Sequence, residues 1–242
     1  MSDCRKKLFD AYHEAVYKQS NSLTQEQFEW ACGTFEHEWG GFIPETKDAV
    51  ILDFGCGVGD FLYYLKKNGY TNFYGIDTSA GQIEYCRLKV SDKAQVIDGR
   101  EFLKDKAGIY DFIMVKDVLE HIPKNEVIEL LGLLHQALKA HGKLVIRVPN
   151  MSNPFGLDAR FNDFTHETGF TSKSLNQVLI TAGFTDVQIL PDQKMVIRSF
   201  KNWIRSILVW KLRHLIRFCY YIQDYTVPNN LDKNIVAVSI KS

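Results

Sequence analysis

The chain has 242 residues, of which 45% are hydrophobic and 24% are charged, a composition typical of a globular protein and not of a disordered chain or a fibre. Lys and Arg together number 29, as do Asp and Glu, and this net charge of zero argues against generic nucleic-acid binding. The five cysteines are scattered and form no CxxC pair, which excludes a disulfide framework, a structural zinc site and an iron–sulfur cluster. Free thiols and the lack of an apolar leader after Met1 favour a cytoplasmic protein.

Strands and helices are predicted to alternate after an N-terminal helical stretch at residues 8–39. Short apolar runs that end at turn residues predict strands at Ala49–Asp53, Phe73–Asp77, Ala94–Ile97, Tyr110–Val115, Lys143–Val148, Asp186–Leu190 and Asn234–Ile240. Helical spacing predicts helices at Phe61–Asn68, Gly81–Lys89, Lys124–Lys139 and Ser174–Ala182. The repeated strand–helix alternation predicts an α/β fold whose parallel sheet is covered on both faces, with right-handed crossovers.

A glycine-rich turn follows the first predicted strand, in the sequence Asp53-Phe-Gly-Cys-Gly-Val-Gly59. Glycines let the backbone turn sharply and let a ligand approach it, and the free N–H groups of the helix that follows would face that ligand. Asp77 ends the second strand, where an acid can accept hydrogen bonds from ribose hydroxyls. The spacing is GxGxG and not GxGxxG, and Asp60 is unfavourable beside a pyrophosphate, so the ligand should carry ribose and adenine without phosphate.

The run Ile51–Gly59 resembles motif I of the class I S-adenosylmethionine-dependent methyltransferases, whose usual form is (V/I)LD(I/V)GCGxG. The resemblance implies a Rossmann-like, doubly wound, seven-stranded sheet that binds S-adenosylmethionine. It implies that the cofactor contacts residues at the ends of the first four strands, namely Asp53, Gly55, Gly57, Gly59, Asp77, Thr78, Asp98, Gly99 and Lys116. A purely structural role for Asp98, as a helix-capping acid, stays open.

Three polar residues, Asp117, Glu120 and His121, follow the fourth strand, at the edge where parallel sheets bind ligands. Two methyltransferase groups carry a similar ExxEH run that holds a divalent metal: the ubiquinone-biosynthesis O-methyltransferases and the small-RNA 2′-O-methyltransferases. This resemblance implies a metal site formed by Asp117, Glu120, His121 and the later His166, although Asp117 is shorter than the glutamate of those groups. The alternative is that His121 packs on the adenine or caps a helix.

The loop after the fifth strand contains Asp163-Phe-Thr-His-Glu-Thr-Gly-Phe-Thr171. It resembles the D(F/I)THExxFT run of a bacterial methyltransferase subfamily tied to surface-polysaccharide biosynthesis, and this resemblance extends over nearly the whole chain. A sugar hydroxyl is a poor nucleophile near neutral pH, and a histidine can accept its proton there. We therefore expect His166 to be the general base, with Asp163 orienting it and His121 as a further acid–base candidate; the alternative is that these residues only shape the loop.

The resemblance implies an O-methyltransferase that acts on a hydroxyl of a sugar nucleotide or glycan in capsule or lipopolysaccharide biosynthesis. Two other functions remain open. One is a small-molecule O-methyltransferase of the quinone type, and the other is a catalytically silent binding module that keeps the cofactor fold. A small-RNA acceptor is disfavoured because the chain outside its one basic segment is acidic.

The basic segment between strands six and seven, residues 193–223, has seven Lys or Arg and no Asp or Glu. Its apolar residues recur at helical spacing, which predicts a basic amphipathic helix. Contact with the inner face of a membrane or with a lipid carrier, a homodimer interface and a lid all remain open. The expected division of the chain is a helical cap over the cofactor site at 1–45, a cofactor-binding core at 46–192, the basic insertion at 193–225 and a final strand at 226–242.

Overall fold

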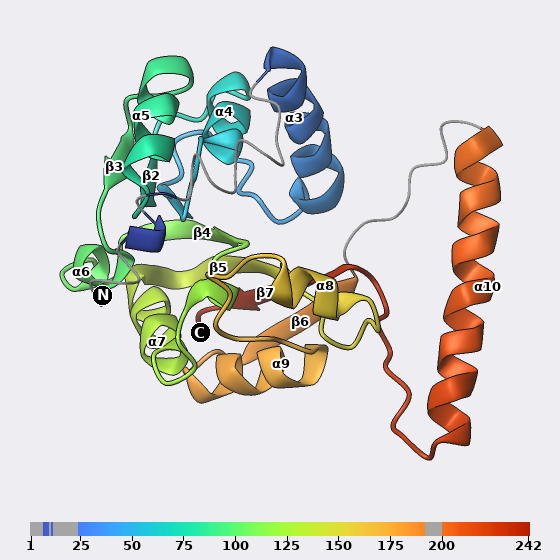
Figure 1. Cartoon of the computed structure of the whole chain (residues 1–242). Coiled ribbons are helices and arrows are strands. Elements are labelled where there is room, and N and C mark those ends of the chain that lie inside the picture. The colour runs from blue at the N-terminus through green and yellow to red at the C-terminus, as the bar shows by residue number, and fades with distance from the viewer. Residues whose placement is uncertain (1–6, 10, 12–23, 192–199) are drawn as a thin grey trace.

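The computed structural model describes residues 7–9, 11, 24–191 and 200–242. A single sheet of seven strands, in the order β3-β2-β1-β4-β5-β7-β6, runs through the molecule (Figure 1). The strands are β1 (Ile51–Phe54), β2 (Phe73–Asp77), β3 (Ala94–Val96), β4 (Tyr110–Lys116), β5 (Leu138–Pro149), β6 (Asp186–Pro191) and β7 (Asn234–Ile240). Strands β1 to β5 are parallel, and β7 runs antiparallel to both β5 and β6. The predicted Rossmann-like fold class is confirmed.

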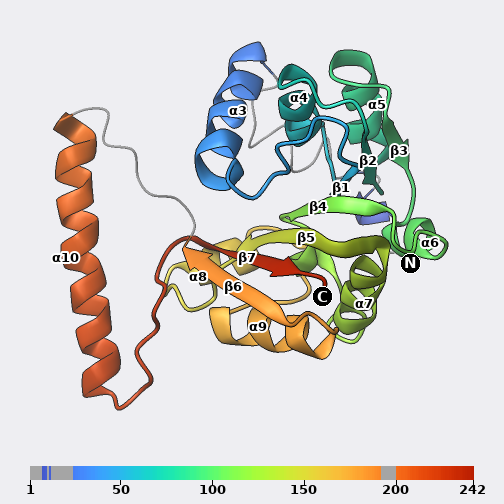
Figure 2. The same cartoon turned by 180° about the vertical axis from the view of Figure 1, so that it is seen from behind.

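Helices cover both faces of the sheet, as Figures 1 and 2 show from opposite sides. They are α3 (Gln25–Trp39), α4 (Asp60–Lys67), α5 (Ala80–Lys89), α6 (Gly99–Leu103), α7 (Val127–Ala137), α8 (Gly156–Phe161), α9 (Ser172–Thr181) and α10 (Phe200–Ile222), with a 3-10 turn η2 (Leu119–His121). One apolar core lies between the sheet and α3, α4 and α5, and a second lies between the sheet and α6, α7 and α9. Because both faces are covered, the carboxyl ends of β1, β2 and β4 form the open edge at which a ligand can bind.

The predicted bounds of β2 and β7 agree with the structure, whereas the other predicted elements differ from it by a few residues and two short helices were not predicted. Strand β5, predicted to begin at Lys143, begins five residues earlier, at Leu138. Sequence analysis did not predict α6 and α8, and it placed the helix after β4 three residues too early, at Lys124. The Glu126 N–H donates to the Pro123 carbonyl at 2.8 Å, so Pro123 begins a turn and the helix itself starts at Val127. That helix ends at Ala137, and β5 begins with the next residue, Leu138.

Helix α3 is the longest described element of the predicted N-terminal cap, and it packs against α4 (Figure 1). Its buried residues Phe28, Cys32, Phe35 and Trp39 recur at helical spacing and so form one face. The Phe35 and Trp39 rings lie 5.0 Å apart between centroids. Residues 12–23 of the predicted helix lie outside the described residues.

Helix α10 is the described part of the predicted basic insertion, and it stands clear of the body in both views (Figures 1 and 2). It occupies 23 residues of the long connection between β6 and β7. Residues 193–199 of that insertion, with Lys194 and Arg198, lie outside the described residues. Within the described ranges, no helix combines the length and apolar character that crossing a lipid bilayer requires.

The two tryptophans of α3 provide a test of how this helix is attached. Trp39 is 1% exposed and Trp30 is 67% exposed. Trp39→Ala should lower the free energy of unfolding by about 3–5 kcal/mol, because it leaves a cavity in the core, and Trp30→Ala should change it by less than about 1 kcal/mol. Urea denaturation of both variants measures this difference. Equal effects of the two substitutions would contradict the packing of α3.

Candidate active site

A cavity of about 590 Å³ lies at the carboxyl ends of β1, β2 and β4. Its wall includes eight of the nine residues predicted to contact the cofactor: Asp53, Gly55, Gly57, Asp77, Thr78, Asp98, Gly99 and Lys116. Gly59, the ninth, precedes α4 with φ 91°, and a Cβ there would lie 2.6 Å from the Cys86 sulfur. Gly59 therefore shapes the glycine turn, whereas Gly55 and Gly57 line the cavity.

The Asp77 carboxylate joins the glycine turn to the end of β2. It accepts hydrogen bonds from the Gly57 N–H at 3.0 Å and from the Ser79 N–H at 2.8 Å. Burial raises the pKa of Asp77, and these backbone donors oppose that rise. Each carboxylate oxygen has two lone pairs, so oxygens held in this way can still accept from a vicinal diol.

Two further acids, Asp53 and Asp60, line the same cavity. Burial raises the pKa of Asp53 to about 8, with the charge of Lys116 opposing the rise. Asp60 is the first residue of α4; burial raises its pKa, and its Oδ1 has no hydrogen-bond partner among the described residues. Sequence analysis used Asp60 only to exclude a pyrophosphate, but the structure adds it to the acidic wall of the site.

Asp98 caps a helix and also lines the cavity. Its side chain accepts from the Arg100 N–H at 2.9 Å and so caps α6. The same residue lines the cavity, beside Gly99. Burial acts to raise its pKa, but the Arg100 backbone donor and charge lower the pKa overall. An ionised acid is therefore held at this end of the cavity.

Other parts of the wall come from α3 and from two basic residues that were not predicted to lie there. Helix α3 contributes Gln27, Trp30 and Thr34, while Arg147 of β5 and Lys233 lie on another side. The only early signal for Arg147 was a charged residue inside the apolar run of a predicted strand. Helix α3 was expected to cover the cofactor site, but the sequence did not indicate which of its residues would face it.

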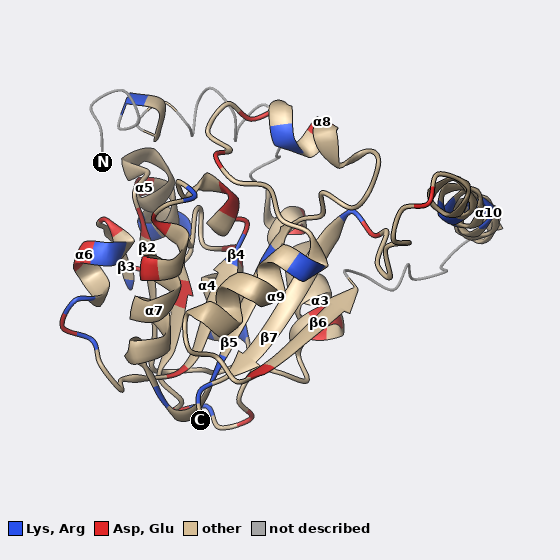
Figure 3. Cartoon of the chain, turned by 90° about the horizontal axis from the view of Figure 1, so that it is seen from below, with Lys and Arg blue, Asp and Glu red and all other residues tan. Residues whose placement is uncertain are grey.

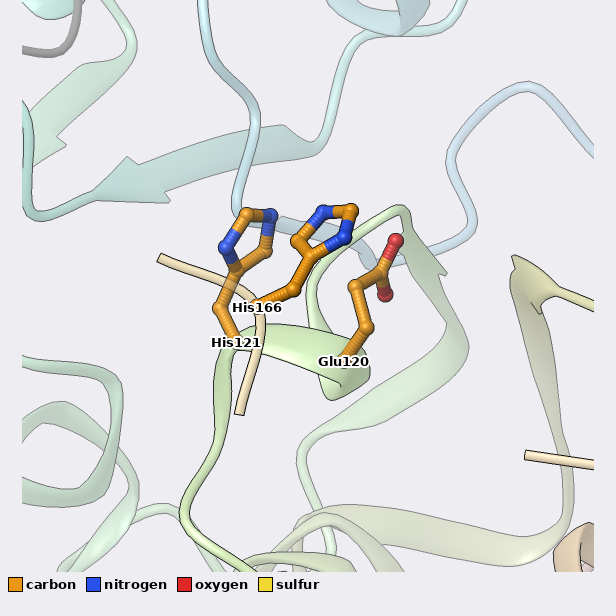
Figure 4. A group of neighbouring side chains, drawn as sticks. All are labelled: Glu120, His121 and His166. Atoms are coloured by element: carbon orange, nitrogen blue, oxygen red, sulfur yellow. The ribbon is translucent and has the colours of Figure 1, made fainter. Parts of the chain in front are cut away.

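A second group of polar side chains adjoins this cavity and is drawn in Figure 4. Ligand atoms of Glu120, His121 and His166 all lie within 4.8 Å of one another. Glu120 and His121 belong to η2, whereas His166 follows α8. The N–H groups of Glu167 and Thr168 donate to the Glu120 carbonyl at 2.8 and 2.9 Å, and these bonds hold the later loop against η2. Of the three residues, only His121 is part of the cavity wall.

Hydrogen bonds determine which nitrogen of each histidine carries the proton. The His166 Nδ1 lies 2.7 Å from the Ala159 carbonyl, which can only accept, so this nitrogen is protonated. The Thr165 hydroxyl donates to the Asp163 carboxylate at 2.6 Å and therefore accepts from the His121 Nδ1 at 2.8 Å. In the neutral tautomer that these hydrogen bonds select, the Nε2 lone pair of each ring is left for a proton or a metal.

Asp163 and Asp117 do not take the positions that sequence analysis expected. Asp163 connects through Thr165 to His121, while its Oδ2 is 4.0 Å from the His166 Nε2. Asp117 has φ 56° and forms an ion pair with Arg147, whose Nε donates to Asp117 Oδ1 at 2.9 Å. The structure therefore brings together three of the four predicted metal ligands and leaves Asp117 outside the group.

The electrostatics of this group suit a cation. Burial, together with the negative charge of Asp117, raises the pKa of Glu120 well above its usual value. The Glu120 Oε2 has no hydrogen-bond partner in the described part of the chain. Burial and the neighbouring His166 lower the pKa of His121 to about 4, so its ring is neutral at pH 7. Carboxylate oxygens and imidazole nitrogens are the ligands that several divalent ions prefer.

Comparison with known proteins assigns the family. The model of the methyltransferase domain matches residues 21–189. The chain is 25% identical over 148 residues to an uncharacterised protein of Rickettsia prowazekii, in an alignment that covers 52% of this chain and 58% of that protein. It is 27% identical over 190 residues to phosphoethanolamine N-methyltransferase 1 of Arabidopsis thaliana, covering 71% of this chain and 37% of that protein. The chain thus spans about three fifths of the first relative's length and less than two fifths of the second's.

The fold is also that of known methyltransferases. A solved S-adenosylmethionine-dependent methyltransferase from Archaeoglobus fulgidus superposes with a TM-score of 0.65 at 22% identity, covering 88% of this chain and 94% of that one. The family model covers well over half of the 242 residues and includes the glycine turn, β4 and η2. The chain therefore belongs to the methyltransferase-domain family.

Proposed function

We propose that this protein transfers the methyl group of S-adenosylmethionine to a hydroxyl of a sugar or glycan of the bacterial cell envelope. The observation that carries the proposal is the group of Glu120, His121 and His166 beside the cofactor cavity, with two Nε2 lone pairs and a buried carboxyl group. Such groups are suited to removing a proton from a weak nucleophile. They adjoin the cavity at the end of β4, where the transferable methyl is expected.

The charges around the cavity favour one orientation of the cofactor. Asp98 and Gly99 would hold the adenine, and Asp77 the ribose diol. The methionine portion would then lie along Asp53 and Asp60, where its positive ammonium and sulfonium groups meet two buried acids. This orientation places the methyl group toward His121, the member of the histidine pair that is part of the cavity wall.

Transfer requires the acceptor oxygen to form a bond to the methyl carbon while the bond from that carbon to sulfur breaks. The His166 Nε2 takes the hydroxyl proton, and S-adenosylhomocysteine leaves with the sulfur electron pair. A positioned general base contributes about 10²–10⁴-fold to such a rate, and alignment of the reacting atoms contributes roughly 7–11 kcal/mol. The Ala159 carbonyl keeps the proton of His166 on Nδ1, so its Nε2 stays a base.

A divalent ion is the alternative occupant of the same residues, because an Nε2 that binds an ion cannot also accept a proton. Glu120, His121 and His166 would hold it, since a carboxylate oxygen and one ring nitrogen of each histidine lie within 4.8 Å of one another. Such an ion would lower the pKa of a hydroxyl bound to it. Thr165 and Asp163 fix the ring of His121 from behind, as outer partners of metal-binding histidines commonly do.

Two features support a sugar acceptor. The Asp163–Thr171 run resembles that of the surface-polysaccharide subfamily. The side chains of Phe161 and Phe164, which flank this loop, are 73% and 87% exposed and offer apolar surface to a bulky acceptor. The named Arabidopsis relative acts on phosphoethanolamine, and its low identity and coverage leave the acceptor of this chain to be established by experiment.

The acceptor can be tested by incubating the protein with methyl-labelled S-adenosylmethionine and panels of nucleotide sugars, envelope glycans, quinols and phosphoethanolamine. The proposal expects label on an oxygen of a sugar, identified by mass spectrometry. Label found only on a quinol or on an amine would contradict the sugar acceptor and assign the acceptor to that class instead. Cofactor binding without transfer to any panel would favour the silent binding module.

Proton release on cofactor binding is expected from the raised pKa of Asp53, which burial brings to about 8. At about pH 6 the unliganded carboxyl is protonated, and the cationic cofactor should draw it into the ionised form and release about one proton. Calorimetry in buffers of different ionisation enthalpy measures this number. Asp53→Asn should lose the release; an unchanged proton count in that variant would assign the proton to another acid.

The base is tested by His166→Ala. This variant should keep its affinity for S-adenosylmethionine, because His166 is not part of the cavity wall, while kcat falls by about 10²–10⁴-fold. His37→Ala, which removes an exposed histidine of α3, is the matched control and should keep its kcat. Normal kcat in His166→Ala would return His166 to a packing role.

Metal dependence tests the alternative in which both histidines are ligands and His166 is not the base. In that case chelator treatment should abolish transfer, and a divalent ion should restore it, because Glu120, His121 and His166 would lose the ion that they share. Elemental analysis should find less metal in His121→Ala than in Asp117→Asn, since Asp117 lies outside the group. Full activity in excess chelator, with no metal in the purified protein, would leave the histidines as acid–base groups alone.

A further inference from the structure

Helix α10 has its polar stripe turned toward the body of the protein. The stripe consists of Asn202, Ser206, Arg213, Arg217 and Tyr220, which recur at helical spacing on one side. Arg213 forms an ion pair with Asp232, and Arg217 donates to the Asn229 carbonyl at 3.2 Å. The Tyr220 hydroxyl donates to the Ser152 carbonyl at 3.4 Å. These contacts hold α10 to the segment before β7 and to the end of β5, and they fix which side faces outward.

The outward side of α10 is therefore apolar. None of its 23 residues, all of them described, is buried. The large apolar side chains opposite the polar stripe are between 41% and 74% exposed: Phe200, Ile204, Leu208, Leu215, Phe218 and Ile222. An exposed apolar surface of this extent marks an interaction site, because water alone is an unfavourable neighbour for it. An amphipathic helix on a surface that faces only water would instead turn its polar side outward.

Three cations lie along the same helix without an acidic partner on it. Lys201, Arg205 and Lys211 are exposed, and α10 contains no Asp or Glu. Figure 3, which looks almost along the axis of α10, shows Lys and Arg on it and no Asp or Glu. Long basic side chains can extend past apolar neighbours to reach a charged surface. The outward side thus combines apolar area with positive charge.

We propose that α10 lies flat on the surface of an anionic lipid bilayer, with its apolar side in the headgroup region. Lipid phosphates complement Lys201, Arg205 and Lys211, and Trp203, Trp210 and Tyr221 belong to the residue types enriched at this depth. The polar stripe stays on the body and keeps the helix parallel to the surface. The proposal does not depend on the acceptor.

A second copy of the chain fits this side less well. Two α10 helices pressed together by their apolar sides would bring Lys201, Arg205 and Lys211 of one copy near those of the other. The helix offers no acidic residue to pair with them, and like charges across an interface oppose association. Anionic lipids supply the missing negative charge, so the charge pattern favours the membrane.

The test is co-sedimentation of the full chain with vesicles of equal parts phosphatidylglycerol and phosphatidylcholine, compared with phosphatidylcholine alone. The protein should bind the anionic vesicles, and the triple variant Lys201→Gln, Arg205→Gln, Lys211→Gln should bind them about 100-fold more weakly. A matched triple, Lys89→Gln, Lys124→Gln, Lys173→Gln, removes three exposed cations of the body and should bind like the wild type. A third variant, Trp203→Ser, Leu208→Ser, Leu215→Ser, keeps every charge and should also lose binding.

Affinity for S-adenosylmethionine shows that each variant is folded, since no residue of α10 lines the cofactor cavity. Wild-type protein that stays in the supernatant with anionic vesicles would overturn the proposal, as would equal losses in the two cation triples. Sedimentation equilibrium tests the alternative that a second copy of the chain binds this side. If the wild-type protein does not bind vesicles and is a dimer that the triple serine variant converts to monomers, this side would be assigned to a second copy.

Discussion

The site depends first on the carboxylate of Asp77, which joins two neighbouring strands at their carboxyl ends. It accepts from the Gly57 N–H of the turn after β1 and from the Ser79 N–H after β2. A buried carboxylate needs such donors, because burial without them is strongly unfavourable. The glycine turn is in turn confined, since a Cβ on Gly55, which has φ 80°, would lie 2.2 Å from a Val118 methyl group. The turn and the start of η2 are thereby packed together.

A second set of backbone bonds extends this arrangement to the histidine pair. The Glu120 carbonyl accepts from Glu167 and Thr168, so the loop after α8 cannot move away from η2 without breaking both bonds. Arg160 donates to the carbonyls of His166 and Glu167. His121 and His166 come from distant parts of the sequence, yet their ring centroids lie 4.6 Å apart. Because main-chain bonds fix this contact, the pair is preorganised before any ligand binds.

Local sequence was sufficient to locate the sheet and most of the predicted cofactor residues that line the cavity. Asp77 ends β2 and Asp53 is the last but one residue of β1, so a pattern read along the chain locates both. The short helices α6 and α8 were missed because five or six residues carry little periodicity. Contacts between distant segments were not predictable from spacing. Asp117 was expected beside a metal but pairs with Arg147 of β5, and Asp163 was expected to orient His166 but acts through Thr165 on His121.

Helix α10 shows the same limit. Its sequence predicts an amphipathic helix, but only the ion pair with Asp232 reveals that the polar side is the one turned inward. The side that a helix presents depends on what its polar residues bind, and here Arg213 and Arg217 bind partners that lie 19 and 12 residues further along the chain. The apolar outward side is consequently a feature of the tertiary structure.

The central claim is that the transferable methyl faces the histidine pair. A crystal structure with sinefungin, a cofactor analogue whose amino group replaces the methyl, tests it most directly. The account predicts that this amine points toward Glu120, His121 and His166 and leaves room for one acceptor oxygen, so that about 5–6 Å separate it from the nearer Nε2. An amine directed toward Trp30 and Thr34 of α3, with Val118 between it and the histidines, would contradict the account.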